Sequence, residues 1–160
     1  MSQEKPVQVI PASNALREKV GGRFNAIDPA AIAKAEAALQ SLAGNFAQWL
    51  NDEVVKLDSA RLRVKNEGQT VEAMEVLYLR CHDLKGLGTT YGFPIVTQFS
   101  SSLCKLIDDK EKRGHAPMML IDAHINAIKA AVRNDIKTDE HDVGRALIAE
   151  LEKSVAELGD

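Results

Sequence analysis

A histidine, a lysine and two glycines within one short segment form the strongest chemical motif of the chain: His82, Lys85, Gly86 and Gly88. A neutral imidazole is a nucleophile near neutral pH, and a side chain three residues further along a helix lies beside it. The lysine cation can neutralise the oxygens of a phosphoryl group that the imidazole accepts. Each glycine costs about 1 kcal/mol relative to alanine inside a helix, so the pair indicates a packing or functional reason.

A helical wheel of about 100° per residue places His82 toward solvent. The apolar stripe of this helix centres between Cys81 and Leu84, and His82 lies about 130° from that centre. Gly86 lies on the same outward face, where it removes the side chain that would hold a partner away from the histidine. Lys85 could instead form an ion pair with an acidic residue of its own helix. The other predicted binding positions are Glu75, Tyr78, Leu79, Thr89 and Gln98.

Five amphipathic helices are predicted after residue 27, and they would carry these side chains. Asp28-Pro29 is typical of a helix start, and Thr70 is a candidate cap for the helix that carries the motif. Gly92 and Pro94 then separate that helix from the next one. The short connections favour antiparallel neighbours. The predicted helical ranges are 29–66, 71–91, 94–112, 117–134 and 140–158.

The predicted fold class is all-α: an antiparallel four-helix bundle with an extra C-terminal helix. It would occupy a domain of residues 28–160, after an irregular N-terminal arm of residues 1–27. The first helix is long enough that a break near residues 58–59 is considered. Phe46 and Trp49 lie on its apolar stripe and are expected in the core, whereas the mixed charges of residues 108–113 suggest a solvated helix end. Cys81 and Cys104 lie in apolar segments and are expected to be reduced core thiols.

The segment His82-Asp83-Leu84-Lys85-Gly86, followed by Gly92, resembles the motif of histidine-containing phosphotransfer (HPt) domains of bacterial phosphorelays. Residues 71–112 are similar to the two central helices of that family, whereas residues 1–27 and 140–158 are not explained by it. The resemblance implies a four-helix bundle in which His82 carries phosphate between aspartates of receiver domains. It also implies that Lys85 neutralises the phosphoryl group, that Gly86 provides clearance, and that Gly92 is the turn glycine.

The same resemblance implies the partners: receiver domains of response regulators and of a hybrid histidine kinase. No cofactor is expected on this chain, because the receiver would supply the Mg²⁺ and the acceptor aspartate. Many family members carry a glutamine on the next helix near the histidine; the aligned position here is Cys104, and Gln98 lies nearly two turns earlier. No ATP-binding loop is present in the sequence, so the chain is expected to be a phosphoryl carrier and not an enzyme.

Composition narrows the class of partner. The formal net charge of −3 gives no basic footprint for nucleic acid. No apolar run approaches the roughly 20 residues of a membrane span, and no apolar segment typical of a secretory signal is seen at the N-terminus. We therefore expect a cytoplasmic monomer that binds neither nucleic acid nor membrane.

Two other functions fit parts of the sequence. One is a helical adaptor that binds a receiver domain without phosphotransfer, and the other is a bundle metalloprotein, for which the paired Glu-x-x-His motifs are missing. The three remaining histidines are expected to be solvated and to hold no metal, since they lack a metal-binding spacing. A serine run at residues 100–102 lacks the strand-to-helix elbow of a hydrolase nucleophile. The polar residues weighed as metal ligands are His115, His124, His141, Asp122 and Asp142.

Overall fold

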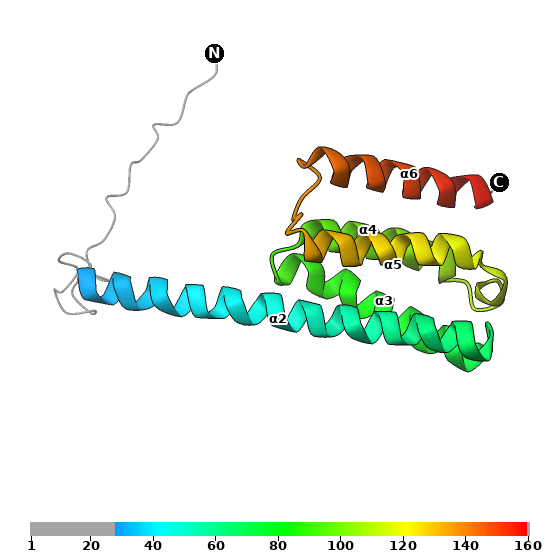
Figure 1. Cartoon of the computed structure of the whole chain (residues 1–160), viewed down its shortest axis with the longest axis horizontal. Coiled ribbons are helices and arrows are strands. Elements are labelled where there is room, and N and C mark those ends of the chain that lie inside the picture. The colour runs from blue at the N-terminus through cyan, green and yellow to red at the C-terminus, as the bar shows by residue number, and fades with distance from the viewer. Residues whose placement is uncertain (1–27, 160) are drawn as a thin grey trace, which may run out of the picture. The chain divides into compact units, whose positions relative to one another are not determined.

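The computed structural model describes residues 28–159, and within them the chain is helical without any strand. The α-helices are α2 (Pro29–Glu67), α3 (Val71–Thr90), α4 (Pro94–Ile107), α5 (Met118–Arg133) and α6 (Asp142–Gly159), and a short 3-10 helix, η1 (Arg113–His115), precedes α5 (Figure 1). The arm predicted for residues 1–27 lies outside the described residues. The boundary between the two structural units of the chain lies inside α2, between residues 39 and 40.

The ends of α2 follow from its sequence. Asp28 precedes the helix, and its Oδ1 accepts a hydrogen bond of 3.0 Å from a backbone N–H of the first turn, while Pro29 takes the first helical position. Gly68 follows the last turn with a φ of +84°, which glycine adopts without strain. The break considered near residues 58–59 is wrong. α2 is continuous over 39 residues, and the Ser59 hydroxyl donates to the backbone carbonyl one turn back, at 2.9 Å.

Burial along α2 begins at Leu50, so the prediction that Trp49 is a core residue is wrong. Trp49 is 44% exposed, and Phe46 is only partly buried. Both rings lie against Tyr91, with centroids 6.1 Å and 5.5 Å from it. The physical reason is a change of helix face: the core-facing stripe starts one residue after Trp49, and one residue turns the face by about 100°.

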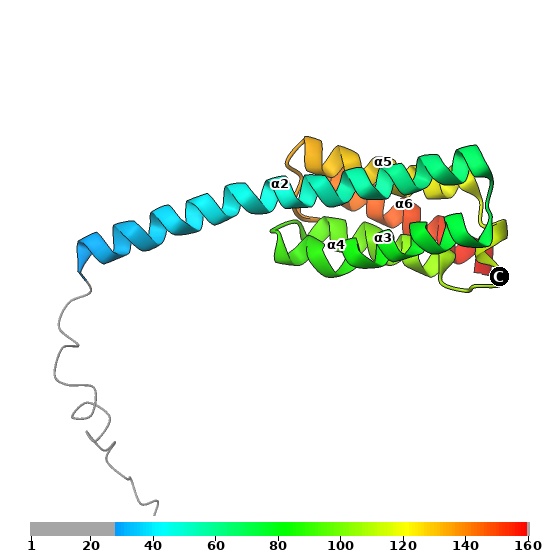
Figure 2. The same cartoon turned by 90° about the horizontal axis from the view of Figure 1, so that it is seen from below.

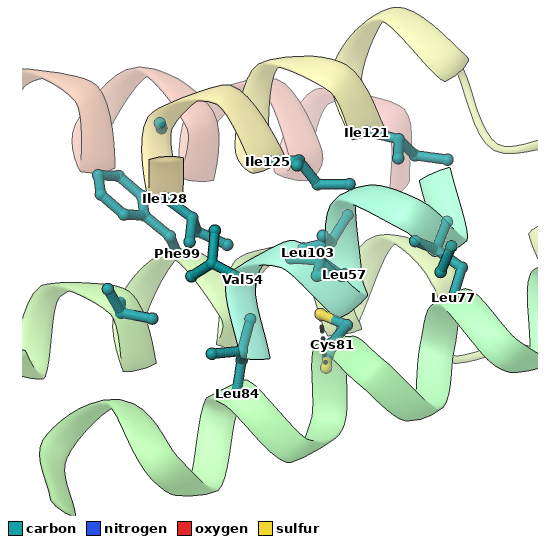
Figure 3. Packing of buried hydrophobic residues seen from close by; sticks show 14 of the residues in the cluster. Val54, Leu57, Leu77, Cys81, Leu84, Phe99, Leu103, Ile121, Ile125 and Ile128 are labelled. Atoms are coloured by element: carbon teal, nitrogen blue, oxygen red, sulfur yellow. Dashed lines mark hydrogen bonds between the residues drawn. The ribbon is translucent and has the colours of Figure 1, made fainter. Parts of the chain in front are cut away.

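The helices of residues 40–159 share one hydrophobic core. Figure 2 shows α3, α4, α5 and α6 beside the later part of α2, and Figure 3 shows buried side chains of α2, α3, α4 and α5 meeting in the core. α4 packs against α3, α5 and α6. A helical bundle is therefore the observed architecture. Its largest fully buried side chains are Leu50, Leu57, Met74, Leu77, Leu84, Ile95, Phe99, Leu103, Ile107, Ile121, Ile125 and Ile128.

α3 and α4 approach each other closely at Gly88. A Cβ atom at this position would lie 2.6 Å from Oγ1 of Thr97 and 2.7 Å from its backbone nitrogen, so the two helices meet backbone to backbone. The Thr97 hydroxyl accepts a hydrogen bond from the backbone N–H of Thr89 at 2.9 Å and donates one to the carbonyl oxygen of Lys85 at 3.1 Å. Gly92, with a φ of +83°, forms the turn between the helices. Close packing against Thr97 therefore explains why residue 88 is a glycine.

α4 ends at Ile107, earlier than the predicted end at residue 112. The Asp109 carboxylate accepts hydrogen bonds from the backbone N–H groups of Glu111 at 2.9 Å and Lys112 at 3.3 Å, and this side-chain turn replaces the helical hydrogen bonds. The prediction of a solvated run over residues 108–113 is wrong at its last residue, because Arg113 is only 3% exposed.

α6 packs against α4 and α5. Leu151 of α6 is buried, and a Cβ atom at Gly144 would lie 2.6 Å from Cδ1 of Ile95, so the start of α6 sits tightly on α4. The backbone N–H of Ile95 donates to the carbonyl oxygen of Lys137 at 2.9 Å, which ties the loop before α6 to the first turn of α4. Across residues 28–159, no helix combines the length and the apolar character that crossing a bilayer would need.

Candidate functional site

His82 lies on the solvent-facing side of α3, where the wheel predicts it. Leu79, one turn before it, is 51% exposed, and Gly86, one turn after it, is exposed as well. A Cβ atom at Gly86 would meet no other atom within 4 Å, so packing does not require a glycine there. The imidazole therefore borders bare, accessible backbone. The open depression at this place is lined by Glu53, Arg80, His82, Asp83, Gly86 and Leu87.

Tyr78 lies beside His82 on the same helix. The two ring centroids are 6.0 Å apart, with an angle of 43° between the planes. The Tyr78 hydroxyl donates a hydrogen bond of 2.9 Å to Oδ1 of Asp108, beyond the end of α4, and this bond raises the pKa of Tyr78. Tyr78 therefore stays a neutral phenol with a fixed ring orientation.

Arg113 is a buried residue that contacts Tyr78 and Glu75, and the sequence did not reveal this role. Its guanidinium lies 4.4 Å from the centroid of the Tyr78 ring. Its Nη1 donates to Oε2 of Glu75 at 2.6 Å, and its Nη2 donates to the carbonyl oxygen of Asp108 at 2.8 Å. The structure thus joins two predicted binding residues, Glu75 and Tyr78, through a buried cation. The mixed charges around Arg113 gave no sign of this, because its partners come from α3 and the end of α4.

Lys85 is exposed and pairs with no carboxylate among the residues that the structure describes. The neighbouring acid Asp83 lies 3.7 Å from Arg80 instead. The ion pair considered for Lys85 on its own helix is therefore not formed within residues 28–159.

The last two predicted binding residues differ in their surroundings. Thr89 is exposed, but its hydroxyl donates to Oγ1 of Thr97 at 3.1 Å, and its backbone N–H contacts the same oxygen. Thr89 therefore takes part in the contact between α3 and α4. Gln98 is partly buried on α4, and in the described part of the chain its side chain forms no hydrogen bond with His82.

Cys81 and Cys104 are free, buried thiols, as predicted. Their sulfur atoms lie 3.2 Å apart and share a hydrogen bond, which Figure 3 shows as a dashed line. The hydrogen bond with Cys104, together with burial, raises the pKa of the Cys81 thiol well above its ordinary range. Cys104, at the position that the resemblance aligns with a glutamine, is thus engaged with Cys81 in the core. The aromatic neighbour of His82 is Tyr78.

The other histidines form no metal site in the described region, where no group of three or more metal-ligating side chains occurs. His115 and His141 are exposed, as predicted. The carboxylates weighed with them form ion pairs: Asp122 lies 2.8 Å from Nζ of Lys65, and Asp142 pairs with an arginine of α6.

His124 is fully buried, so the prediction of a solvated side chain is wrong. Its Nδ1 lies 2.7 Å from the carbonyl oxygen of Leu120, and its Nε2 lies 2.9 Å from the hydroxyl of Ser102. A carbonyl oxygen can only accept, so Nδ1 carries the proton and Nε2 accepts from Ser102. Burial lowers the pKa of His124, because the charged imidazolium would lose its hydration. A neutral histidine is therefore part of the core.

This buried histidine predicts that the fold loses stability in mild acid. Because the folded-state pKa of His124 lies below the unfolded value of about 6.5, the unfolded chain binds more protons than the folded one as the pH falls through that value. The contribution of His124 to the free energy of unfolding is therefore fully present above pH ~6.5 and declines as the pH falls below that value. Urea unfolding between pH 7.5 and 5.5 should show this decline in the wild type and a flatter profile in His124→Gln. The exposed residue provides the control: His141→Gln should keep the wild-type slope.

Titration of Asp58 cannot produce the same decline in stability between pH 7.5 and 5.5. Burial disfavours its charge, but the hydrogen bond from Lys129 and the positive charge of Arg61 hold the pKa of Asp58 below its ordinary value of 3.8. Its contribution to stability is lost only as the pH falls below that value. An equal slope in the wild type and in His124→Gln would contradict the assignment of the decline to His124.

Comparison of the chain with family models, with curated proteins and with solved structures finds no match.

Proposed function

We propose that this protein is a histidine phosphotransfer protein, which carries a phosphoryl group on His82 between aspartates of receiver domains. The observation that carries the proposal is the exposed imidazole of His82 beside Gly86, a helical glycine at which an added Cβ atom would meet no atom from outside its own stretch of helix within 4 Å. A glycine inside a helix costs about 1 kcal/mol, and packing gives no reason for this one. The glycine at residue 86 is instead explained by clearance for a partner that closes over the histidine.

The chemistry needs little from this chain. An imidazole nitrogen of His82 attacks the phosphorus of an aspartyl phosphate on the first receiver. A nitrogen–phosphorus bond forms, the bond from phosphorus to the aspartate oxygen breaks, and the carboxylate leaves with the bonding electron pair. A carboxylate of the second receiver then attacks the phosphohistidine in the same manner. The receiver supplies the Mg²⁺, and Lys85 neutralises charge on the phosphoryl oxygens.

The arrangement of helices is part of the proposal. The later part of α2 with α3, α4 and α5 corresponds to the four-helix bundle that the resemblance implies, and α6 is the extra C-terminal helix. The proposed docking surface consists of Leu79, His82 and Gly86 on α3. The partners are receiver domains of response regulators and of a hybrid histidine kinase.

The test is transfer of label from purified receiver domains that carry a radiolabelled aspartyl phosphate. We expect the full chain to take up label that is lost in acid and retained in base, as a phosphohistidine requires. The acyl phosphate of the receiver is labile in both, so the two species are distinguished. If the chain binds the receivers but takes no label from any of them, it is an adaptor and the proposal is wrong.

Lys85→Ala should slow phosphotransfer more than it weakens receiver binding. Lys85 faces charge that develops on the moving phosphoryl group, so its loss should raise the transition-state energy by about 1.5–3 kcal/mol, which makes transfer slower by roughly 10- to 150-fold. Rapid-quench kinetics and receiver affinity, measured on the same samples, give the two effects separately. Lys153→Ala is the matched control, because it also removes an exposed lysine but lies on α6, a different helix from the one that carries His82. A normal transfer rate with weakened affinity would make Lys85 a docking residue.

A further inference from the structure

Arg113 is a buried cation whose contacts lead toward His82. It is 3% exposed, and its guanidinium meets three groups from two parts of the chain: the Glu75 carboxylate, the Asp108 carbonyl oxygen and the face of the Tyr78 ring. Burying a charge costs free energy that an apolar side chain of similar size would not require. The fold alone therefore gives little reason for an arginine at this place.

The contacts of Arg113 fix the Tyr78 ring. The guanidinium lies 4.4 Å from the ring centroid, and the phenol hydroxyl donates to Asp108 at 2.9 Å. The same stretch, residues 108–113, therefore contacts the face and the tip of the ring. A desolvated cation over an aromatic face attracts the ring, so this contact favours one orientation of the Tyr78 ring.

We propose that Arg113 is a positioning residue for His82 and acts through Tyr78. The fixed Tyr78 ring lies 6.0 Å from the imidazole, centroid to centroid, and occupies space into which an otherwise exposed histidine side chain would rotate. Restricting the imidazole to fewer rotamers keeps its nitrogen aimed outward, and such orientation speeds a transfer step. The rate effect rests on the phosphotransfer function proposed above, whereas the orientation of the ring does not.

A second arginine of the fold provides a matched control. Arg61 of α2 is 8% exposed and also holds a buried guanidinium, through Asp58, Asp122 and Asn126. None of these partners is on α3 or lies against His82. Arg61→Met and Arg113→Met therefore remove comparable buried ion pairs, and only the second one changes the support of the Tyr78 ring.

The experiment measures three quantities on full-length variants: unfolding free energy, the NMR rotamer populations and ring-current shifts of the His82 imidazole, and the rate of phosphorylation. Phosphoryl donors are a labelled receiver and phosphoramidate, a small donor whose phosphorus–nitrogen bond breaks with release of ammonia. Arg113→Met should broaden the rotamer distribution of His82 and slow uptake from both donors about tenfold. Arg61→Met should destabilise the fold but leave the His82 spectrum and the uptake rate as in the wild type.

The route through Tyr78 has its own test. Tyr78→Leu should slow uptake as much as Arg113→Met, Tyr78→Phe should keep most of the rate because the ring and its cation contact remain, and the double variant should be no slower than Tyr78→Leu alone. If Arg113→Met does not fold, Arg113→Lys and Tyr78→Leu still decide the question, since a lysine side chain would keep the charge without the flat contact on the ring.

The outcomes separate this inference from the proposed function. If the wild type takes up no phosphate but Arg113→Met broadens the rotamer distribution of His82, the phosphotransfer function is contradicted and the positioning role is supported. If the wild type takes up label, and Arg113→Met and Arg61→Met have the same uptake rate and the same His82 spectrum, the positioning role is overturned. Losses that multiply in the double variant would also overturn it, because Arg113 would then act independently of Tyr78.

Discussion

His82→Ala will take no phosphoryl label from any phosphorylated receiver, and it will unfold at nearly the same denaturant concentration as the wild type. Alanine offers no nucleophile, so the loss should be complete and not a slower rate. The side chain lies on the solvent face of α3, where truncation leaves no cavity, so the free energy of unfolding should change by about 0.5 kcal/mol or less. Label uptake and urea unfolding are measured on the same preparation.

His115→Ala and His141→Ala are the controls for this variant, because both residues are exposed and lie outside α3. Both should accept phosphate at the wild-type rate. Label that persists on His82→Ala, or label that disappears from one of the control variants, would place the phosphoacceptor elsewhere and refute the role of His82.

Gly88→Ala will destabilise the bundle, although the same change two residues earlier will stabilise it. The added methyl group at Gly88 would lie 2.7 Å from the backbone nitrogen of Thr97, which cannot move without shifting α4. Overpacking of this kind costs about 3 kcal/mol, and the better helix propensity of alanine returns at most about 1 kcal/mol. We expect a net loss of about 2 kcal/mol in urea unfolding.

Gly86→Ala is the matched control for that substitution, on the same helix and with the same chemical change. A methyl group there meets no atom within 4 Å, so the variant should gain about 0.5–1 kcal/mol from helix propensity alone. If both variants gain stability, α4 gives way at Gly88 and the close contact is not a constraint. If both lose stability, the space beside Gly86 is not open.

The contrast between these glycines illustrates what the sequence could predict. Periodicity alone placed His82 outward, because the orientation of a side chain on a helix depends on local spacing. The same periodicity also placed Gly86 outward and Gly88 on the apolar stripe, but it could not show that Gly88 lies against the backbone of Thr97, which belongs to another helix. The all-helical class, the cap at Asp28 and the turn at Gly92 were likewise local features, and they are confirmed.

The errors share a different cause. His124 and Arg113 are polar residues that average preferences assign to solvent, yet partners distant in sequence satisfy their hydrogen bonds and allow burial. Trp49 is the opposite case, a large apolar side chain left half exposed because the core-facing stripe of α2 begins one residue later. In each case the deciding contact is tertiary. A single sequence carries no direct record of such contacts.

The Thr97 hydroxyl makes α3 and α4 parts of one cooperative unit. In an uninterrupted α-helix the N–H of Thr89 would bond the carbonyl of Lys85, and here both groups contact an oxygen that belongs to α4. The turn that follows His82 therefore completes its hydrogen bonding only when the hairpin is closed. Exchange of the Thr89 amide with solvent deuterium therefore reports separation of the two helices and not fraying of α3, and the last turn of α3 opens only with the α3–α4 hairpin.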